Sequence, residues 1–421
     1  MTKRRVVVTG IGAMTPLGNT AEESWEGILA HKCAIAPITH YDTSDMKVKN
    51  AAQLQDGAVE SQFNAREIKK NDRCTLIGLI AANEAMKDAG FELGEDGKVN
   101  PAIVNTDRFG VLFSAGIGGL QTFDDACLRG ASAGYDKIMP FFIPSTIINI
   151  TAGRIAIEYG LHGACTSVVT ACASGTNSIG EAFRQIRDGY LDRSLCGSTE
   201  ASITRVGMGG FTSMHALSTE IDPARCSIPF DKERSGFVMG EGAGALVLEE
   251  YEAAIARGAK IYCEIVGYGT NCDAHHITAP CDDGSGAAKC MALALQDAQI
   301  TPEKIDYINA HGTSTPLGDA GESQAVRKTF GNHANDILVS STKSATGHLL
   351  GASGSVEAIF CIKALQSSTI PATLNYRVPD PVCDLNYVPN ECVKKEISYA
   401  LSNSLGFGGH NATIILKKFD Q

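Results

Sequence analysis

The sequence predicts an α/β fold made of two related halves. Short β-rich runs alternate with amphipathic helical runs along the chain, as expected for strands covered by helices. A weak internal repeat suggests duplication: VVVTGIG near the start resembles EIVGYGT near residue 265, and VLFSAGIGG resembles YINAHGTST. Repeats this short also arise by chance, so duplication and coincidence both stay open. If the repeat is real, the halves cover residues 1–255 and 256–421.

The elements follow from local patterns. Strands are expected where β-branched and aromatic residues cluster: Arg4–Gly10, Arg108–Gly116, Gly244–Glu250, Ile261–Gly269, Ile305–Gly312 and Asn411–Phe419. Helices are expected where apolar residues recur with helical spacing: Ala21–His31, Arg73–Ala89, Ser178–Asp188, Ser285–Ala298, Gly321–Phe330 and Ser353–Leu365. Gly258 is placed to end another helix, because glycine favours the position after a helix C-terminus.

Composition narrows the function classes. The chain has 421 residues, 44% of them hydrophobic and 20% charged, which is typical of globular proteins. A net charge of −11 disfavours nucleic-acid binding. The start lacks the features of a signal peptide, and no run of about 18 apolar residues predicts a membrane span. The 14 cysteines form no CxxC pair, so we expect reduced thiols in a cytoplasmic protein.

Cys172 is the first candidate for chemistry. It lies in TACASGTNSIGEAFRQIRDG, after SVV, which has the pattern of a strand, and before a helical pattern. Free N–H groups at a helix N-terminus favour a thiolate, so we expect a lowered pKa, and they can also hold an oxyanion. The alternative is a buried small side chain at a helix start.

Two histidines lie in polar, glycine-bearing segments of the second half. His311, in NAHGTSTPLGD, follows a strand and precedes the hydroxyls of Thr313 and Thr315. His348 lies among small residues in SSTKSATGHLLGASGSVEAIF, together with Lys343 and Glu357. A cysteine with two histidines suits thiol acyl transfer. A zinc site is the competing hypothesis, although the spacings match no zinc motif. For His311 the alternative is a loop histidine that is bound only by its neighbours.

Phe407 lies between glycines in SNSLGFGGHNATI. An aromatic side chain between glycines can move as a gate, and its backbone N–H can face an oxyanion. The alternative is a glycine-rich hairpin turn.

Several long motifs together resemble one family, the β-ketoacyl-[acyl-carrier-protein] synthases of fatty-acid synthesis, and most closely their type II elongating enzymes. The motifs are TACASGTNSIGEA, FDKERSGFVMGEGAGALVLEEYEAAIARGAKIY, NAHGTSTPLGD, STKSATGHLLGASGSVEAIF and GFGG, and the likeness extends over nearly the whole chain. The resemblance implies a thiolase-like fold, with two similar α/β halves stacked as five layers, and a cytoplasmic homodimer.

The resemblance also implies the reaction and the role of each residue. An acyl chain passes from acyl carrier protein to Cys172, malonyl-carrier-protein loses carbon dioxide, and the resulting carbanion attacks the Cys172 thioester. His311 and His348 would stabilise the enolate, Lys343 with Glu357 would tune His348, and Phe407 and Cys172 would supply oxyanion N–H groups. The family positions for substrate binding are Thr313, Thr315, Ile117 and Asp273. No resident cofactor or metal is implied, because 4′-phosphopantetheine arrives on the carrier protein.

An acidic carrier protein needs a basic docking site despite the net charge. The family places carrier contacts at Arg66, Lys69 and Lys70, in NAREIKKNDR, where helical spacing puts them on one face. A solvated helix surface is the alternative. Three departures from the family pattern, His215, Ser235 and Asp136, put the strength of carrier binding in doubt, although not the reaction.

Rival functions leave distinct sequence marks. A thiolase would have a second cysteine in the C-terminal glycine motif, and GFGGHN has none. A coenzyme A-dependent starter synthase would pair one histidine with asparagine. A polyketide ketosynthase stays open, although the free-standing length and the type II-like motifs disfavour it. A catalytically silent partner subunit would lack the nucleophile, whereas Cys172, His311 and His348 are all present.

Overall fold

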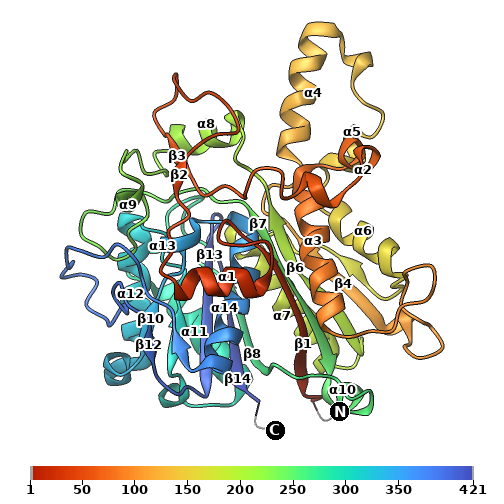
Figure 1. Ribbon diagram of the computed structural model, residues 1–421. Coiled ribbons are helices and arrows are strands. Elements are labelled where there is room, and N and C mark those ends of the chain that lie inside the picture. Colours follow the sequence, from red (N-terminus) through yellow and green to blue (C-terminus); the bar gives the residue numbers. More distant parts are fainter. Residues whose placement is uncertain (1–2, 420–421) are drawn as a thin grey trace.

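The computed structural model describes residues 3–419, and its centre is one mixed sheet of ten strands (Figure 1). Neighbouring strands follow the order β10-β9-β13-β14-β8-β1-β7-β6-β4-β5. They are β1 (Val6–Met14), β4 (Phe109–Ser114), β5 (Cys165–Thr166), β6 (Arg193–Glu200), β7 (Gly242–Glu250), β8 (Cys263–Cys272), β9 (Tyr307–Asn309), β10 (Leu338–Ser340), β13 (Tyr399–Gly406) and β14 (His410–Lys418). Two short pairs lie outside this sheet: β2 (Ala36–Pro37) with β3 (Asn50–Ala51), and β11 (Thr369–Ile370) with β12 (Val393–Lys394).

The ten strands form two sets of five with the same connectivity. In chain order the sets are β1, β4, β5, β6, β7 and β8, β9, β10, β13, β14, and in both the spatial order is third, second, fourth, fifth, first. The strand directions agree pair by pair. The sets meet only where Val6–Val8 pair with Cys263–Ile265. The chain therefore contains a structural repeat whose halves change between Glu250 and Cys263, and the finer boundary at 255/256 stays a prediction.

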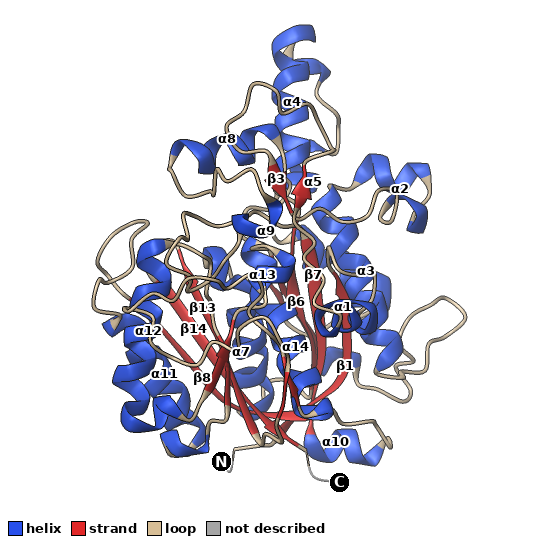
Figure 2. Cartoon of the chain, turned by 60° about the vertical axis from the view of Figure 1, so that its left-hand side comes forward, coloured by secondary structure: helices blue, strands red, loops and turns tan. Residues whose placement is uncertain are grey.

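The two sets of strands form two separate layers, and helices complete a five-layer stack of helix, strands, helix, strands, helix (Figures 1 and 2). The helices α3 (Arg73–Asp88) and α6 (Ile150–Tyr159) cover the outer face of the first set of strands. The helices α11 (Ser285–Ala298) and α12 (Pro316–Phe330) cover the outer face of the second. Between the two sets, α7 (Ser174–Arg187) packs against α14 (Ser353–Ser367). This arrangement confirms the predicted thiolase-like α/β architecture.

The repeat in the sequence has a packing cause. A Cβ atom on Gly10 would come within 2.3 Å of a carbonyl oxygen of α3, and one on Gly12 within 2.2 Å of another. In the second half, Gly267 and Gly269 approach α11 with the corresponding distances of 2.4 and 2.2 Å. Only glycine allows each first strand to lie this close to its helix. The GxG shared by VVVTGIG and EIVGYGT therefore marks equivalent contacts in the two halves.

The remaining helices have nine residues or fewer, except α4, which has 14. Several of them, with the β2–β3 pair, gather at one end of the stack (Figures 1 and 2). They are α1 (Ala21–Leu29), α2 (Ala65–Lys70), α4 (Leu120–Ala133), α5 (Phe142–Thr146), α8 (Arg205–Ser213), α9 (Pro223–Cys226), α10 (Tyr251–Ala256) and α13 (Lys343–Thr346). Within residues 3–419, no helix combines the length and apolar character needed to cross a bilayer.

The expected elements differ from the structure around Cys172 and in several elements that the sequence patterns did not indicate. The run SVV is not a strand, because β5 comprises only Cys165–Thr166, and α7 starts four residues before the expected Ser178. The strands β6, β10 and β13 and the helices α4 and α6 are not among the expected elements. Gly258 has φ of 67° directly after the last turn of α10, as expected for a helix-ending glycine.

Candidate active site

Cys172 lies in a tight turn that continues directly into α7. Residues 171–173 form a single 3-10 turn, and Ala171 has φ of 51°, a left-handed conformation that is strained for a residue other than glycine. Ser174 Oγ holds the turn, accepting from Thr170 N at 2.9 Å and donating to Ala171 O at 2.7 Å. The backbone N–H groups of Cys172 and Phe407 both act on the Cys172 sulfur. The Cys172 thiol thus has two N–H donors beside it, its own and that of Phe407, which comes from a distant part of the chain.

The expected lowering of the Cys172 pKa is wrong. Burial raises the pKa of this thiol to about 12, although Lys343 and the N–H groups of Phe407 and Cys172 act in the opposite direction. The negative charge of Glu200 adds to the increase. A helix N-terminus can stabilise a thiolate, but here the desolvation of the sulfur outweighs it. The free protein therefore holds Cys172 as a neutral thiol.

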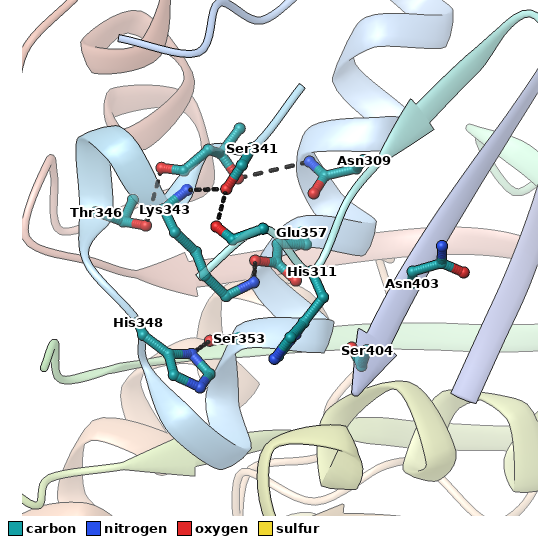
Figure 3. Close-up of polar contacts among 12 residues, drawn as sticks. Asn309, His311, Ser341, Lys343, Thr346, His348, Ser353, Glu357, Asn403 and Ser404 are labelled. Atoms are coloured by element: carbon teal, nitrogen blue, oxygen red, sulfur yellow. Dashed lines mark hydrogen bonds and ion pairs between the residues drawn. The ribbon is translucent and has the colours of Figure 1, made fainter. Parts of the chain in front are cut away.

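The two histidines lie side by side (Figure 3). His311 follows β9 and His348 follows α13, and both side chains are buried. Their ring centroids are 5.3 Å apart with the planes at 89°. His348 Nδ1 lies 3.0 Å from Ser353 Oγ at the start of α14, which orients that ring. Burial, with the nearby Lys343 charge, keeps the pKa of both histidines well below the usual range. Both imidazoles are therefore neutral at physiological pH.

Lys343 and Glu357 form a buried ion pair behind these rings (Figure 3). The Lys343 side chain is 1% exposed and that of Glu357 4%. Burial raises the pKa of Glu357 to about 7, whereas the Lys343 charge lowers it. A buried charge without a partner is costly, so each member requires the other. The pair keeps a positive charge close to both histidines without exposing it to solvent.

One cavity joins the candidate residues. It has a volume of about 400 Å³. The predicted site residues that line it are Cys172, His311, His348, Thr313, Thr315, Asp273 and Phe407. Thr313 Oγ1 and Thr315 Oγ1 lie 3.0 Å apart. A pocket of this size, mainly apolar and with a few converging polar groups, is typical of a small-molecule or cofactor-arm site.

Phe407 occupies the tip of the β13–β14 hairpin and also lines the cavity. The hairpin turn is therefore confirmed, and the role of Phe407 as a gate stays a prediction. The segment after β8 is tied to this tip. Asp273 N donates to Gly409 O at 2.8 Å, and Asn411 Nδ2 donates to Asp273 Oδ1 at 2.6 Å. Phe407 also lies near Phe211, with ring centroids 6.2 Å apart. Any movement of Phe407 therefore involves the Asp273 segment.

For metals, the part of the chain that the structure describes contains no group of three or more His, Cys, Asp or Glu side chains arranged to hold an ion.

Comparison with known proteins identifies the family of this chain. Residues 3–254 match the model of the beta-ketoacyl synthase N-terminal domain, and residues 262–377 match that of the C-terminal domain. The chain belongs to the beta-ketoacyl synthase family. The 3-oxoacyl-[acyl-carrier-protein] synthase 2 of Synechocystis sp. is 47% identical to this synthase, and that of Staphylococcus aureus is 46% identical, each over 99% of both chains.

Solved structures of the family have the same fold. A beta-ketoacyl synthase from Burkholderia phymatum is 34% identical to this synthase, with a TM-score of 0.90 over 99% of this chain and 100% of that chain. A second similar structure is a chain of the complex AntDE:AntF, described as a type II PKS acyl-carrier protein in complex with its ketosynthase bound to the hexaketide. That chain is 33% identical to this synthase, with a TM-score of 0.91 over 100% of both chains.

Besides Lys343 and Glu357, which lie next to the histidines, four predicted positions of this synthase lie away from the cavity lining. Arg66 and Lys69 are exposed on α2, and Lys70 lies over the ring of Phe141 at 4.9 Å. Ile117 packs against the same apolar cluster as Cys172, and its role in an acyl pocket stays a prediction. Among the three departures, His215 and Ser235 line the cavity, while Asp136 is exposed on a distant turn.

Sequence reasoning missed three buried carboxylates. Glu322 accepts hydrogen bonds from His311 N and Gly312 N, both at 2.8 Å. One turn earlier in α12, Asp319 accepts from the backbone of the neighbouring loop residues. The third, Glu200, is described below. The available signal was weak: acidic residues close to glycine-rich loops, a place where backbone N–H groups need acceptors.

Proposed function

We propose that this synthase catalyses the decarboxylating condensation of acyl-[acyl-carrier-protein] with malonyl-[acyl-carrier-protein] in fatty-acid elongation. The products are β-ketoacyl-[acyl-carrier-protein], carbon dioxide and the free carrier thiol. The observation that carries this proposal is the meeting of Cys172, His311 and His348 in one cavity, with two backbone N–H groups at the sulfur. The relatives named 3-oxoacyl-[acyl-carrier-protein] synthase 2 support it.

In the first half-reaction, Cys172 attacks the carbonyl carbon of the acyl thioester. The developing oxyanion is stabilised by the N–H groups of Cys172 and Phe407. The carbon–sulfur bond to the carrier arm then breaks, and the proton of the Cys172 thiol ends on the departing pantetheine sulfur. Because the thiol is neutral beforehand, it does not react readily with other electrophiles.

In the second half-reaction, malonyl-carrier-protein binds near the histidines. Neutral His311 and His348 can each donate one N–H to the thioester carbonyl, which stabilises the enolate as carbon dioxide leaves. The enolate carbon attacks the Cys172 thioester, and the carbon–sulfur bond breaks. The sulfur then takes up the proton that the overall reaction consumes. Lys343 adds a positive charge nearby without binding the substrate directly.

The cavity also suits the carrier's prosthetic arm. Thr313 and Thr315 present hydroxyls on the cavity wall and are proposed to contact pantetheine. Phe407, with the Asp273 segment tied to it, is proposed as the gate between the acyl pocket and the malonyl site. No resident cofactor is required, because the thiol ester arrives on the carrier.

We propose that an acidic acyl carrier protein docks on α2. Arg66 and Lys69 are exposed there, and Lys70 extends the same basic stretch. A charge-reversed variant, Arg66→Glu with Lys69→Glu, should raise KM for the carrier substrate with little change in kcat. The effect should shrink as salt increases, since electrostatic docking is screened. An unchanged KM would place the docking site elsewhere.

We also infer a homodimer in the cytoplasm, where soluble carrier-protein substrates would be available. The strands β5 and β10 form the two edges of the sheet. The β10 edge is hydrogen-bonded to a segment of the same chain, because Val339 N donates to Asn386 O. Large apolar side chains near β5 are exposed, including Ile157 at 70% and Val169 at 46%. An uncovered edge beside such residues favours pairing with a second copy. Light scattering should give twice the chain mass of 44.4 kDa.

The deciding experiment for the reaction is intact mass spectrometry. The protein is mixed with long-chain acyl-carrier-protein and malonyl-carrier-protein, beside a Cys172→Ala variant. We expect a product extended by two carbons, and an acyl adduct at Cys172, with the unaltered protein only. Absence of both would overturn the proposal. Products extended repeatedly without reduction would instead indicate a polyketide ketosynthase.

A further inference from the structure

Glu200 is a buried carboxylate that gathers hydrogen bonds from two separate turns. It is the last residue of β6 and is 0% exposed. Its oxygens accept from Gly116 N at 2.8 Å, Ile117 N at 3.2 Å and Gly118 N at 3.2 Å, all in the turn after β4. They also accept from Gly351 N at 3.1 Å, in the turn after His348. Burial raises the pKa of Glu200, whereas the four backbone donors act in the opposite direction and favour its charged form.

The two turns touch each other at the anchor. A Cβ atom on Gly351 would come within 2.1 Å of Gly116 N, and one on Gly116 would come within 2.6 Å of Glu200 Oε2. The backbones are therefore in direct contact, with no side chain between them. Leu350, next to Gly351, has φ of 48°, a strained conformation that needs support from its surroundings. Glu200 supplies that support.

These turns carry side chains of the apolar cluster against which Cys172 packs, and in the proposed function this cluster is the wall of the acyl pocket. Ile117, on the first turn, and Leu350, on the second, belong to one apolar cluster with Cys172. A movement of either backbone would move an apolar side chain of the cluster that Cys172 packs against. The position of this wall is therefore tied to the Glu200 carboxylate.

Glu200 also acts on Cys172 through its charge. It forms no ion pair with any residue from 3 to 419, and its only side-chain partner is Ser202 Oγ at 3.1 Å. Its negative charge raises the pKa of Cys172, against Lys343. The two histidines facing the thiol are neutral, so they do not offset this effect. Lys343 is itself paired with Glu357.

We propose that Glu200 is a positioning residue that fixes the two turns forming the acyl-pocket wall and thereby sets which acyl chains the synthase accepts. The part concerning acyl chains rests on the proposed condensing function. A second consequence does not depend on it. Removing the charge of Glu200 should make the Cys172 thiolate easier to form, an effect that a purely structural role would not produce.

Two variants of Glu200 distinguish the effect of its hydrogen bonds to the two turns from the effect of its negative charge on Cys172. Glu200→Gln keeps the length but replaces one acceptor oxygen by an NH2 group that cannot accept from backbone N–H groups. Glu200→Asp keeps the charge but is too short to reach both turns. Glu84→Gln is the matched control, since Glu84 is also a largely buried carboxylate with backbone N–H partners, Ala13 N at 2.8 Å and Ala21 N at 2.9 Å, but it ties β1 and α1 to α3.

Alkylation of Cys172 by iodoacetamide is measured at pH 8, with the modified residue identified by peptide mass spectrometry. A thiol pKa lower by about one unit gives about tenfold more thiolate, partly offset by its weaker nucleophilicity. We expect alkylation about three- to tenfold faster in Glu200→Gln, and wild-type rates in Glu200→Asp and Glu84→Gln. Condensation is then measured with acyl carriers of increasing chain length and with branched chains. Both Glu200 variants should shift relative kcat/KM towards the longest and branched chains by about fivefold or more, whereas Glu84→Gln should not.

The proposal is overturned if Glu200→Gln matches Glu84→Gln in both measurements. If Glu200→Gln does not fold, Glu200→Asp still decides, because an unchanged chain-length preference in that variant contradicts the positioning role. If the unaltered protein forms no condensation product, the proposed function fails. The alkylation rates still test the action of Glu200 on Cys172.

Discussion

The imidazole rings of His311 and His348 meet edge to face, with centroids 5.3 Å apart and planes at 89°. They come from two different loops of the second half, and each is buried. Burial is the main reason that both pKa values lie well below the usual range, and the charge of Lys343 lowers them further. The pair is therefore built to donate neutral N–H groups and not to carry charge.

Because both histidines are neutral, we expect the decarboxylation rate to stay constant on the acid side of its pH profile. A histidine with lowered pKa stays neutral until the pH falls below that value, so decarboxylation of malonyl-carrier-protein should be unchanged between about pH 8 and pH 6. The rate of carbon dioxide release is the measurement. A loss of half the rate near pH 6.5 would mean that a histidine titrates normally. Replacing either histidine by alanine should lower the rate about 100-fold or more.

The Lys343–Glu357 pair predicts a stability effect that depends on both partners. Lys343→Met leaves the Glu357 carboxylate buried without its cation, which should cost about 3 kcal/mol or more of unfolding free energy. The double variant with Glu357→Gln should recover most of this loss, because no buried charge is left unpaired. Urea unfolding followed by circular dichroism measures both. Equal destabilisation of the single and double variants would argue against the pairing.

The double variant of Lys343 and Glu357 should recover its stability and yet show a changed pH dependence of decarboxylation. Lys343 lowers the pKa of His311 and His348, so its loss should raise both values towards the usual range. In the double variant, which is expected to be stable, the decarboxylation rate should then begin to fall at a higher pH than in the unaltered protein.

Much of the fold could be predicted because its main signals are local. The first strands of the two halves carry continuous apolar runs and a GxG that allows close helix packing, so both the strands and the repeat are visible. In contrast, β6 and β13 carry buried small polar residues, such as Ser198 and Ser404. Ser404 Oγ bonds to Thr176 Oγ1 across the central layer at 2.7 Å. Such strands have no apolar alternation, and periodicity cannot detect them.

The sequence singled out the cysteine and the histidines that the structure brings together in one cavity, but it did not predict their environment. Cys172, His311 and His348 stand out because their flanking residues are small and glycine-rich. The direction of the Cys172 pKa depends on desolvation and on Glu200, which lies 28 residues further along the chain. Glu200 and Glu322 resemble surface acids in the sequence. Their burial depends on backbone N–H groups that only the folded loops bring together.

Glu84 predicts how stability changes with pH outside the active site. Burial raises its pKa from 4.5 to about 7, so the native state holds a proton that the unfolded state has lost. The stabilisation is complete below about pH 4.5 and disappears as pH rises through 7, a difference of up to about 3 kcal/mol. Glu84→Gln should remove this slope when urea unfolding is compared at pH 5 and pH 8. Retention of the full slope would assign it to Asp319 and Glu357, whose pKa values are also raised to about 7.

Glu322 and Asp319 lie one turn apart on α12, and we expect their substitution to affect different kinetic constants. Glu322 holds His311 N and Gly312 N, so Glu322→Gln, which loses one acceptor oxygen, should misplace the imidazole and lower kcat about tenfold or more with KM nearly unchanged. Asp319 instead accepts from Ser314 N at 3.1 Å, between the two threonines proposed to bind pantetheine. Asp319→Asn should therefore act mainly on KM for the carrier substrate. Steady-state kinetics of condensation distinguishes the two, with circular dichroism as the check on folding. If both variants change kcat and KM in the same proportion, α12 supports the loop as a whole, and the separate roles of its two carboxylates are contradicted.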